Sequence, residues 1–331
     1  SGAGESAFPL RHSETRSGRE RAVDRDRRGV MGRPWWRAFA VRGVVWRHYL
    51  DFGLTNVPFY LRPIMIFFWT VLFFFFAAPA RRAILGNLRV ILPGSNSILN
   101  LGRAWLTLYN FAWTISDAAD HKLAKTEFLY ETEGAEFLEQ LAAARGAILL
   151  TAHMGNYDLG AAVFAERFER EIRMVRAPEA DQQTARHLDE SLERAGAGAV
   201  KVAYNTASMA LPFELLNALR EGEIVSIQGD RAVAHVSQRK AHLFREEVML
   251  PDGPFMLAFV AQTPIFPLFI VRTKFHRYKI IARQPIHCLR AGPDRAAAIE
   301  EAMREWSQTL ESVIATNWSQ WFSLVPIFPE R

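Results

Sequence analysis

The chain has 331 residues, enough for one large catalytic domain with an N-terminal extension. Half of its residues are hydrophobic, including 24 Phe and 9 Trp. A compact core needs fewer large apolar side chains than this, so we expect some to face lipid. The net charge of +5 favours anionic partners such as lipid headgroups or an acidic carrier protein. The single cysteine, Cys288, excludes an internal disulfide and a multi-cysteine metal cluster.

The N-terminal region changes texture near Met31. Residues 1–30 are polar, carry arginines among acidic residues and show no apolar period, so we expect a disordered basic leader. Apolar residues become frequent from Met31 onward. We therefore predict a membrane-anchoring region over residues 31–90 and a catalytic domain over residues 91–331.

Residues 64–78 form an uncharged apolar stretch with proline and arginine on both sides. As one helix over residues 63–80 it would extend about 27 Å, slightly less than a bilayer crossing usually needs. A buried core helix should show polar breaks at helical spacing, and the four phenylalanines at residues 73–76 allow none. We therefore predict a helix that inserts into the membrane, with its basic flanks docked on an anionic leaflet.

Beyond this stretch, helical and strand-like patterns alternate, as in an α/β domain with a mostly parallel central sheet flanked by helices. Helices are predicted at residues 134–146, closed by Gly146, at 157–168, and at 208–222, closed by Gly222. Buried strands are predicted at residues 147–153, 171–176, 223–230 and 263–272, with residues 278–286 pairing beside the last. Residues 293–318 form an amphipathic pattern whose apolar side includes Ile299, Met303, Trp306, Leu310 and Val313.

The sequence HMGNYD at residues 153–158 holds the candidate catalytic centre. His153 ends a strand, Gly155 permits a tight turn, and Asp158 falls about one helical turn into the next element, so the two side chains can meet. Asp158 would accept a hydrogen bond from one imidazole nitrogen, leaving the other to take a proton from a hydroxyl. Backbone amides at the helix start could stabilise an oxyanion. The same pair could instead only lock a turn.

Charged residues also follow two other predicted strands. Arg176 ends one strand, and Asp230 with Arg231 ends another. Parallel α/β folds place their sites at this edge of the sheet, so these side chains are candidates for the same site. The alternative is a structural ion pair between Arg176 and Asp230.

The segment AILLTAHMGNYDLG, together with RRAILGNLRVILPGS, QGDR, TPIFPLF and NWSQWFSLVPIF, resembles the bacterial lipid A late acyltransferases, the lauroyl and myristoyl acyltransferases of the lysophospholipid acyltransferase superfamily. The resemblance covers most of residues 58–328. It implies that His153 is the general base and Asp158 its orienting partner. It also implies substrate binding by residues of the catalytic block and the neighbouring strand ends, namely Gly155, Asn156, Arg176, Asp230 and Arg231.

Two departures leave the acceptor open. Arg231 stands where the family often has Gln, and HLFREEVML around Phe244 replaces an expected Phe-Gly segment. Phosphatidylinositol mannoside acyltransferases share the catalytic motif. The residues therefore do not by themselves identify lipid A as the acceptor.

The predicted protein is an O-acyltransferase at the inner membrane, with its catalytic domain on the cytoplasmic face. It would move a fatty acyl chain from acyl carrier protein or coenzyme A to a hydroxyl of a lipid or glycolipid, with no metal or other cofactor. One alternative is a metal-dependent hydrolase whose ligands include His153, Asp158 and either Asp230 or His235. Another is a non-catalytic membrane scaffold. Nucleic-acid binding is not expected, because no recognised reading motif is present.

Overall fold

The computed structural model describes residues 52–53, 56–58, 60–124, 128–157, 160, 164–165, 168–178, 199–206, 210–231, 236–288 and 294–329. The predicted leader over residues 1–30 and the first part of the predicted anchoring region lie outside them. All described residues belong to one compact unit, Arg47–Arg331.

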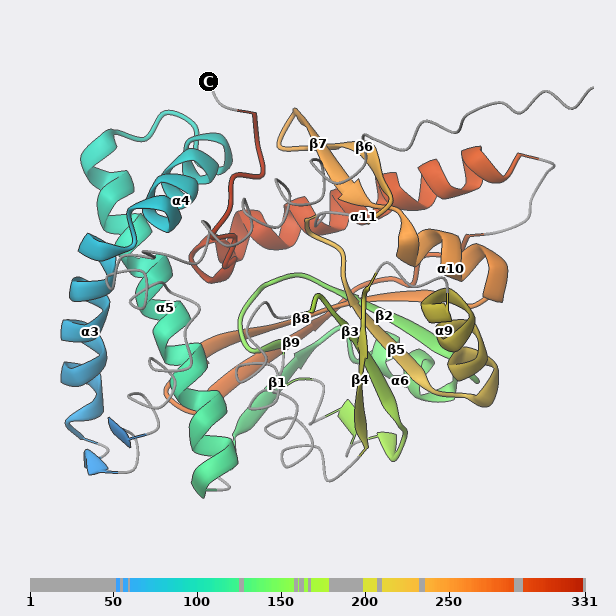
Figure 1. Cartoon of the computed structure of the whole chain (residues 1–331), viewed down its shortest axis with the longest axis horizontal. Helices are drawn as coiled ribbons and strands as arrows, with labels where there is room; N and C mark the ends of the chain where they lie inside the picture. The colour runs from blue at the N-terminus through green and yellow to red at the C-terminus, as the bar shows by residue number, and fades with distance from the viewer. Residues whose placement is uncertain are drawn as a thin grey trace, which may run out of the picture. The chain divides into compact units, whose positions relative to one another are not determined.

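A seven-stranded sheet forms the centre of this unit (Figure 1). Its order is β1-β9-β8-β2-β5-β3-β4, and every neighbouring pair is parallel except β8 with β9. The predicted mostly parallel sheet is thus confirmed. The strands are β1 (Leu129–Glu133), β2 (Ala147–Thr151), β3 (Ile172–Arg176), β4 (Val200–Tyr204), β5 (Ile224–Gln228), β8 (Ile265–Lys274) and β9 (Arg277–Ala282).

Helices cover both faces of this sheet, which explains why the central strand β2 is buried at every residue. The helices are α6 (Ala135–Ala143), α9 (Ala210–Glu221), α10 (Gly253–Ala261) and α11 (Arg295–Asn317), and the 3-10 helix η2 (Trp318–Gln320) follows α11. Ile148 and Leu150 pack with α9, α10 and α11, whereas Ala147 and Leu149 pack on the opposite face with α6.

The predicted amphipathic C-terminal helix is confirmed as α11, whose apolar residues are buried against the sheet. Its first turn is capped by Asp294, which accepts hydrogen bonds from two backbone amides. The helix predicted to close at Gly222 is confirmed as α9, and Gly222 has the positive φ of a C-terminal glycine. The predicted helix at residues 157–168 lies mostly outside the described residues.

The prediction of a single helix over residues 63–80 is wrong, because the helix is interrupted at Ala77. Helix α3 (Arg62–Phe76) ends there and α4 (Ala78–Ile91) starts anew, with a bend of 91° between them. Pro79 at the start of α4 explains the break, since proline lacks the backbone N–H that a continuous helix would donate to the Phe75 carbonyl, and its ring would clash with that carbonyl. In the described part of the chain, no single helix is both long and apolar enough to cross a membrane. The bent pair of α3 and α4 reaches that length and apolar composition only when the two helices are taken together.

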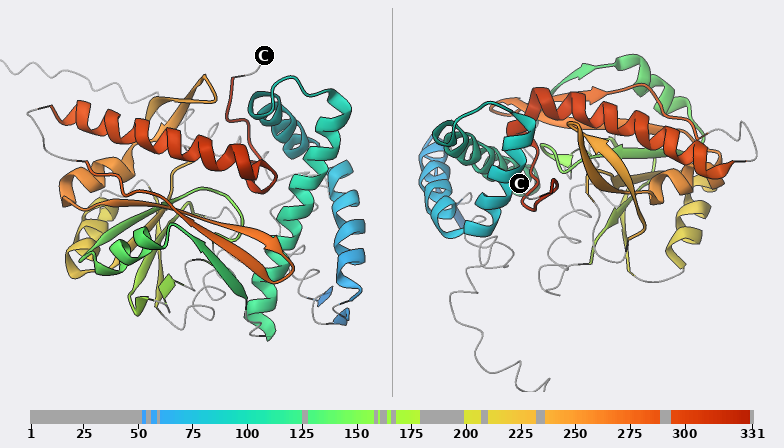
Figure 2. Two further views of the ribbon diagram at one scale, coloured as in Figure 1. Left: turned by 180° about the vertical axis from the view of Figure 1, so that it is seen from behind. Right: turned by 90° about the horizontal axis from the view of Figure 1, so that it is seen from above.

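A long helix, α5 (Ser97–Ala124), was not predicted and lies between α3 and the sheet (Figures 1 and 2). Arg62 at the start of α3 forms an ion pair with Asp120 of α5 at 2.6 Å. Apolar side chains of α4 and α5 form a small core, against which Phe73 and Phe74 of α3 pack. The three helices are thereby joined to the domain that holds the sheet.

The segment around Phe244 forms a hairpin of β6 (Gln238–Leu243) and β7 (Glu246–Pro251), which the sequence did not predict. Its two turn residues, Phe244 and Arg245, have φ values of 52° and 65°. Glycine and asparagine are favoured in this left-handed region, yet both turn residues here carry larger side chains. The Glu311 carboxylate accepts a hydrogen bond from the Phe244 amide at 2.6 Å and holds the turn on α11.

Two further differences concern element ends and edge strands. Helix α6 ends at Ala143, three residues before Gly146, so Gly146 does not cap it as predicted. Glycine is needed at residue 146 because a Cβ there would lie 2.2 Å from the Leu219 carbonyl oxygen. Strands β1 and β4 were not predicted. Both are the outermost strands of the sheet, and exposed positions interrupt their apolar patterns.

Candidate active site

The register of two adjacent parallel strands brings His153 and Asp230 together. Thr151 at the end of β2 pairs with Gln228 at the end of β5. His153 and Asp230 each follow two residues later, so both lie at the carboxyl edge of the sheet. The amide of Gly229 donates to the Thr151 carbonyl at 2.8 Å and extends the pairing beyond the strands. This is the edge at which parallel α/β sheets place their ligands.

The Asp230 carboxylate is fully buried and holds the His153 ring. Its Oδ1 lies 2.7 Å from His153 Nδ1, and its Oδ2 accepts a hydrogen bond from Trp321 Nε1 at 2.9 Å. The His153 side chain is 17% exposed. An imidazole that donates from Nδ1 to a carboxylate has Nε2 available as a proton acceptor, so this pair can act as a general base.

The carboxyl group of Asp230 is ionised despite its burial. Burial raises its pKa, but the charge of His153 and the hydrogen bond from it, the charge of Arg231, and the Trp321 hydrogen bond lower the pKa to about 2. The buried negative charge is therefore compensated by nearby donors and cations.

The turn after His153 requires Gly155 for two reasons. Its φ is +52°, and a Cβ there would lie 1.7 Å from the backbone oxygen of Ile270 in β8. No side chain fits that space. The next residue, Asn156, is buried, and its amide donates to the Thr114 carbonyl at 3.3 Å and to the Tyr278 hydroxyl at 3.4 Å. Both residues therefore shape the turn, and the binding role predicted for them stays a prediction.

The remaining predicted site residues are less closely grouped. Asp158 lies outside the described residues, and the carboxylate that the structure places on His153 Nδ1 is that of Asp230. Arg176 ends β3. Continuing the pairing of β3 with β5 sets Arg176 level with Gln228, two residues before Asp230. Arg231 is partly buried, and its charge lowers the pKa of Asp230. The oxygens of Asp230 accept from His153 and Trp321, not from Arg176 as the ion-pair alternative required.

The C-terminal segment contributes residues to the site that the sequence reasoning missed. Trp321 contacts Asp230, and the Gln320 side chain bonds the backbone N–H and C=O of Arg272 in β8 at 2.7 and 2.8 Å. The Gln-Trp pair was noticed only as part of the family resemblance. The sequence around Gln320 and Trp321 gives no indication that these residues contact the turn after His153, more than 150 residues earlier. Only the packing of the folded chain reveals this contact.

A second buried polar cluster lies behind the turn. Asp117 of α5 accepts hydrogen bonds from the Tyr278 hydroxyl at 2.5 Å and from Arg272 Nε at 3.0 Å. Burial raises the pKa of Asp117, and Arg272 and Tyr278 oppose that rise. Because Tyr278 also accepts from Asn156, this cluster links α5 to the His153 turn.

This cluster also bears on the metal alternative. In the described part of the chain, the acidic and imidazole groups close enough to share a cation are Asp117, Asp120 and His276, with ligand atoms within 4.8 Å of one another. Arg272 and Arg62 already pair with the two carboxylates and balance their charge. The group does not include His153. Of the ligands proposed for a metal site at His153, Asp158 and His235 lie outside the described residues.

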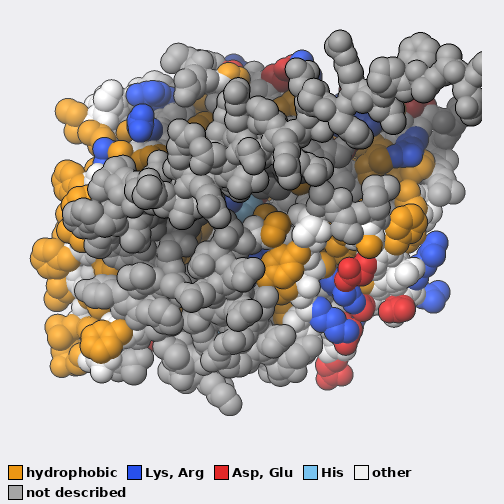
Figure 3. All heavy atoms as spheres, in the orientation of Figure 1, with side chains coloured by type: hydrophobic (Ala, Val, Ile, Leu, Met, Phe, Trp, Pro, Cys, Tyr) orange, Lys and Arg blue, Asp and Glu red, His pale blue; other side chains and the backbone are white. Residues whose placement is uncertain are grey.

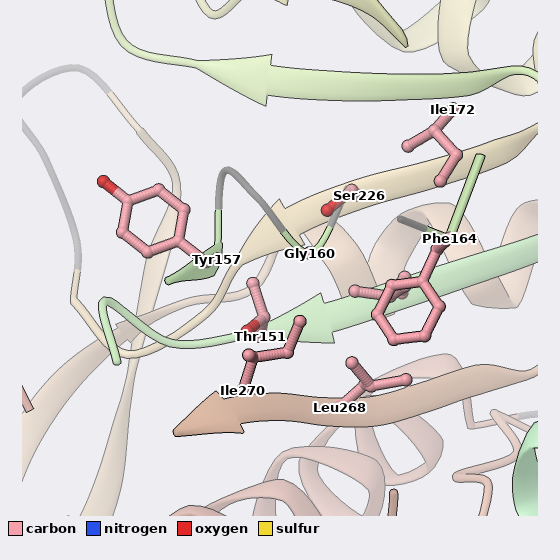
Figure 4. A pocket seen from close by; sticks show the side chains of 9 residues that line it. Thr151, Tyr157, Gly160, Phe164, Ile172, Ser226, Leu268 and Ile270 are labelled. Carbon is pink, nitrogen blue, oxygen red and sulfur yellow. The ribbon is translucent and has the colours of Figure 1, made fainter. Parts of the chain in front are cut away.

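A small pocket lies on the α6 face of the sheet next to the site, with a cavity volume of about 10 Å³ (Figure 4). Leu268 and Ile270 project from β8 toward the same space as Phe164, with Thr151 and Ser226 on the neighbouring strands. Tyr157 stands at one end, and its ring centroid lies 5.7 Å from that of His153. The lining of the pocket is mostly apolar, but its side chains leave room for no more than about one water molecule.

The fold and these contacts define an α/β protein with a histidine and a buried carboxylate at the carboxyl edge of a parallel sheet. The comparison with protein families gives the class: the model for bacterial lipid A biosynthesis acyltransferases matches residues 94–329, well over half of the chain. The chain belongs to this family, and the resemblance seen in its sequence is confirmed. It is therefore an acyltransferase of a lipid A biosynthesis family. The comparison with curated proteins gave no match.

Proposed function

We propose that the protein transfers a fatty acyl chain from a thioester, carried by acyl carrier protein or coenzyme A, to a hydroxyl of a lipid or glycolipid acceptor of the lipid A type. The observation that carries the proposal is the hydrogen bond between His153 Nδ1 and the buried, ionised Asp230, in a chain of this family. It leaves Nε2 of a partly exposed imidazole as the base.

The proposed reaction proceeds in two steps. His153 Nε2 removes the proton of the acceptor hydroxyl while the hydroxyl oxygen attacks the thioester carbonyl carbon. The tetrahedral intermediate then collapses, the carbon–sulfur bond breaks, and the thiol leaves with the proton from His153. Asp230 stabilises the imidazolium between the steps. Gly155, Asn156, Arg176 and Arg231 keep their predicted binding roles, and the reaction needs no resident metal or cofactor. Asp158 stays proposed as an acidic residue of the catalytic block, while Asp230 orients the ring through Nδ1.

We place the protein on the cytoplasmic face of the inner membrane, where these thioesters are available. Hydrophobic side chains gather along the edge of the molecule where α3 lies (Figure 3). Phe68, Phe75 and Phe76 are 65%, 69% and 78% exposed, and the start of α5 adds exposed Ile98 and Leu99. Exposed apolar patches of this kind mark membrane or protein contacts, and a lipid acceptor favours the membrane.

The pocket beside Tyr157 supports a place for the acyl chain. It begins near His153 and is walled by Leu149, Phe164, Leu268 and Ile270. In the proposed complex, the thioester carbonyl lies at His153, and the acyl chain enters between these apolar side chains as they move apart to admit it.

The test is turnover by the purified full-length protein with acyl carrier protein or coenzyme A thioesters and a lipid A-type acceptor, with thioester loss and acylated lipid both measured. His153→Ala should lower the rate about 10²- to 10⁴-fold, the usual contribution of a general base. His242→Ala, at an exposed position on β6, is the control and should retain activity. A wild-type protein that consumes no thioester with any lipid hydroxyl, or full turnover by His153→Ala, would refute the proposal.

A further inference from the structure

The chain that follows α11 runs beside the His153 turn and bonds to it on both sides. The Phe322 amide donates to the His153 carbonyl at 2.7 Å, and the Gly155 amide donates to the Gln320 carbonyl at 3.0 Å. Trp321, between these two contacts, is 3% exposed. Its backbone is held to the turn, so its side chain has a fixed position relative to Asp230.

The Trp321 indole and the His153 imidazole bind different oxygens of one carboxylate. Trp321 Nε1 donates to Asp230 Oδ2 at 2.9 Å, and His153 Nδ1 lies 2.7 Å from Asp230 Oδ1. A carboxylate bonded at one oxygen can still rotate about its last side-chain bond. A second bond at the other oxygen fixes the plane of the group, and with it the direction from which the imidazole is held.

We infer that Trp321 is a positioning residue that acts on His153 through Asp230, as the third member of a His153–Asp230–Trp321 chain. The inference rests on the proposed function, because it assigns His153 as the base. Indole is neutral and donates only, so Trp321 orients the carboxylate without titrating. The titratable groups that face this pair among the described residues are Arg231, whose charge acts on Asp230, and Tyr157, whose ring contacts that of His153.

Loss of the indole N–H has two expected effects. Asp230 Oδ2 becomes a buried acceptor without this donor, so the plane of the carboxylate is no longer fixed, although Oδ1 stays bonded to His153 Nδ1. The carboxylate also loses a hydrogen bond that spreads its charge, so it holds the imidazole proton more tightly. The base is then less well aligned, and more alkaline solution is needed to keep it unprotonated.

Trp321→Phe tests these effects, because phenylalanine keeps most of the buried ring and removes the donor. We expect kcat to fall about 10- to 100-fold with little change in KM, and the acid limb of the pH–rate profile to move to higher pH. The matched control is Trp306→Phe. Trp306 is equally buried and donates through Nε1 to the carbonyl of Gly229 at 3.0 Å, beside Asp230 but not to its carboxylate. This control should lower the melting temperature and leave the acid limb in place.

Two further measurements separate positioning from packing. In an Asp230→Asn background, Trp321→Phe should have little additional effect on kcat, since both changes break the same chain. A pH titration of the His153 imidazole by NMR, in wild type and in Trp321→Phe, needs no turnover. A shifted titration with an inactive wild type would refute the acyl-transfer proposal and support the Trp321 inference. An unshifted titration, or a Trp321→Phe variant that behaves like Trp306→Phe, would overturn the inference.

Discussion

The carboxylate of Asp230 sits in a fully buried position, and its ionised state decides what His153 can do. Its pKa is lowered to about 2, below the value near 3.9 of an unfolded aspartate. A depressed folded-state pKa stabilises the fold above the unfolded pKa, and this stabilisation is lost as pH falls through the folded pKa. The stabilisation contributed by ionised Asp230 is therefore lost as pH falls from about 4 to about 2. At neutral pH the carboxylate is always available to His153.

Asp230→Asn should keep the fold and remove the acceptor. The amide group would donate to His153 Nδ1, place the ring proton on Nε2 and abolish the base. We expect turnover to fall roughly 10³- to 10⁴-fold, as for the equivalent change in the serine-protease triad. Thermal melts of the wild type should show a loss of roughly 2 to 3 kcal/mol between about pH 4 and pH 2, and those of Asp230→Asn should lack it. Asp252→Asn, at a buried aspartate paired with Arg239 instead, is the control and should stay active. Near-normal turnover of Asp230→Asn would contradict the assignment.

At the scale of elements, the pocket depends on how strands β2, β5 and β8 meet the helical residues after the turn. The strands present small or branched side chains to it, among them Thr151, Ser226 and Ile270. Ser226 lies in the middle of β5, so a larger side chain there would fill the pocket without touching the His153–Asp230 pair.

Ser226→Leu should therefore shorten the preferred acyl chain. We expect discrimination on the order of tenfold against the longest donors, with shorter donors used at nearly the wild-type rate. Overpacking should cost about 1 to 3 kcal/mol of stability. Competition among thioesters of different chain length, followed by lipid mass spectrometry, measures the change. Ser226→Ala leaves the volume open and serves as the control; an unchanged chain-length profile in Ser226→Leu would show that the chain lies elsewhere.

Over the whole molecule, α3 forms an apolar outer edge, and α5 connects it to the sheet. The connection includes the Arg62–Asp120 ion pair between α3 and α5 and the contacts of Asp117 with Arg272 and Tyr278. Arg82 in the first turns of α4 and Arg89 in its last turn are exposed. This combination of exposed phenylalanines and nearby arginines suits a surface of anionic lipid.

The triple variant Phe68→Ser, Phe75→Ser and Phe76→Ser should reduce binding to phosphatidylglycerol-containing vesicles on the order of 100-fold. The fold should be retained, because these side chains are exposed. Vesicle sedimentation and a thermal melt measure the two quantities. A triple variant at other exposed apolar positions, Leu129→Ser, Phe213→Ser and Met249→Ser, is the control and should bind as wild type does. Equal loss in both variants would mean that α3 is not the membrane contact.

Several parts of this protein depend on local sequence pattern and could be predicted from it. Continuous apolar runs predicted the buried strands β2 and β5, and the residues after them marked His153 and Asp230 as edge residues. Apolar spacing predicted α11, and Pro79, which the sequence contains, explains the break that the apolar count alone missed. The family was also readable from motifs, and the family match confirms it.

Which side chains meet at the site depends on how distant segments of the chain pack together. The local pattern predicted Asp158 as the partner of His153 and placed Asp230 only at the same edge of the sheet. The pairing of β2 with β5 carries the Asp230 carboxylate, 77 residues away, to Nδ1, and Asp158 lies outside the described residues. The return of the chain after α11 brings Trp321 to that same carboxylate. Such contacts depend on strand order, register and packing, and these are properties of the whole fold rather than of any segment.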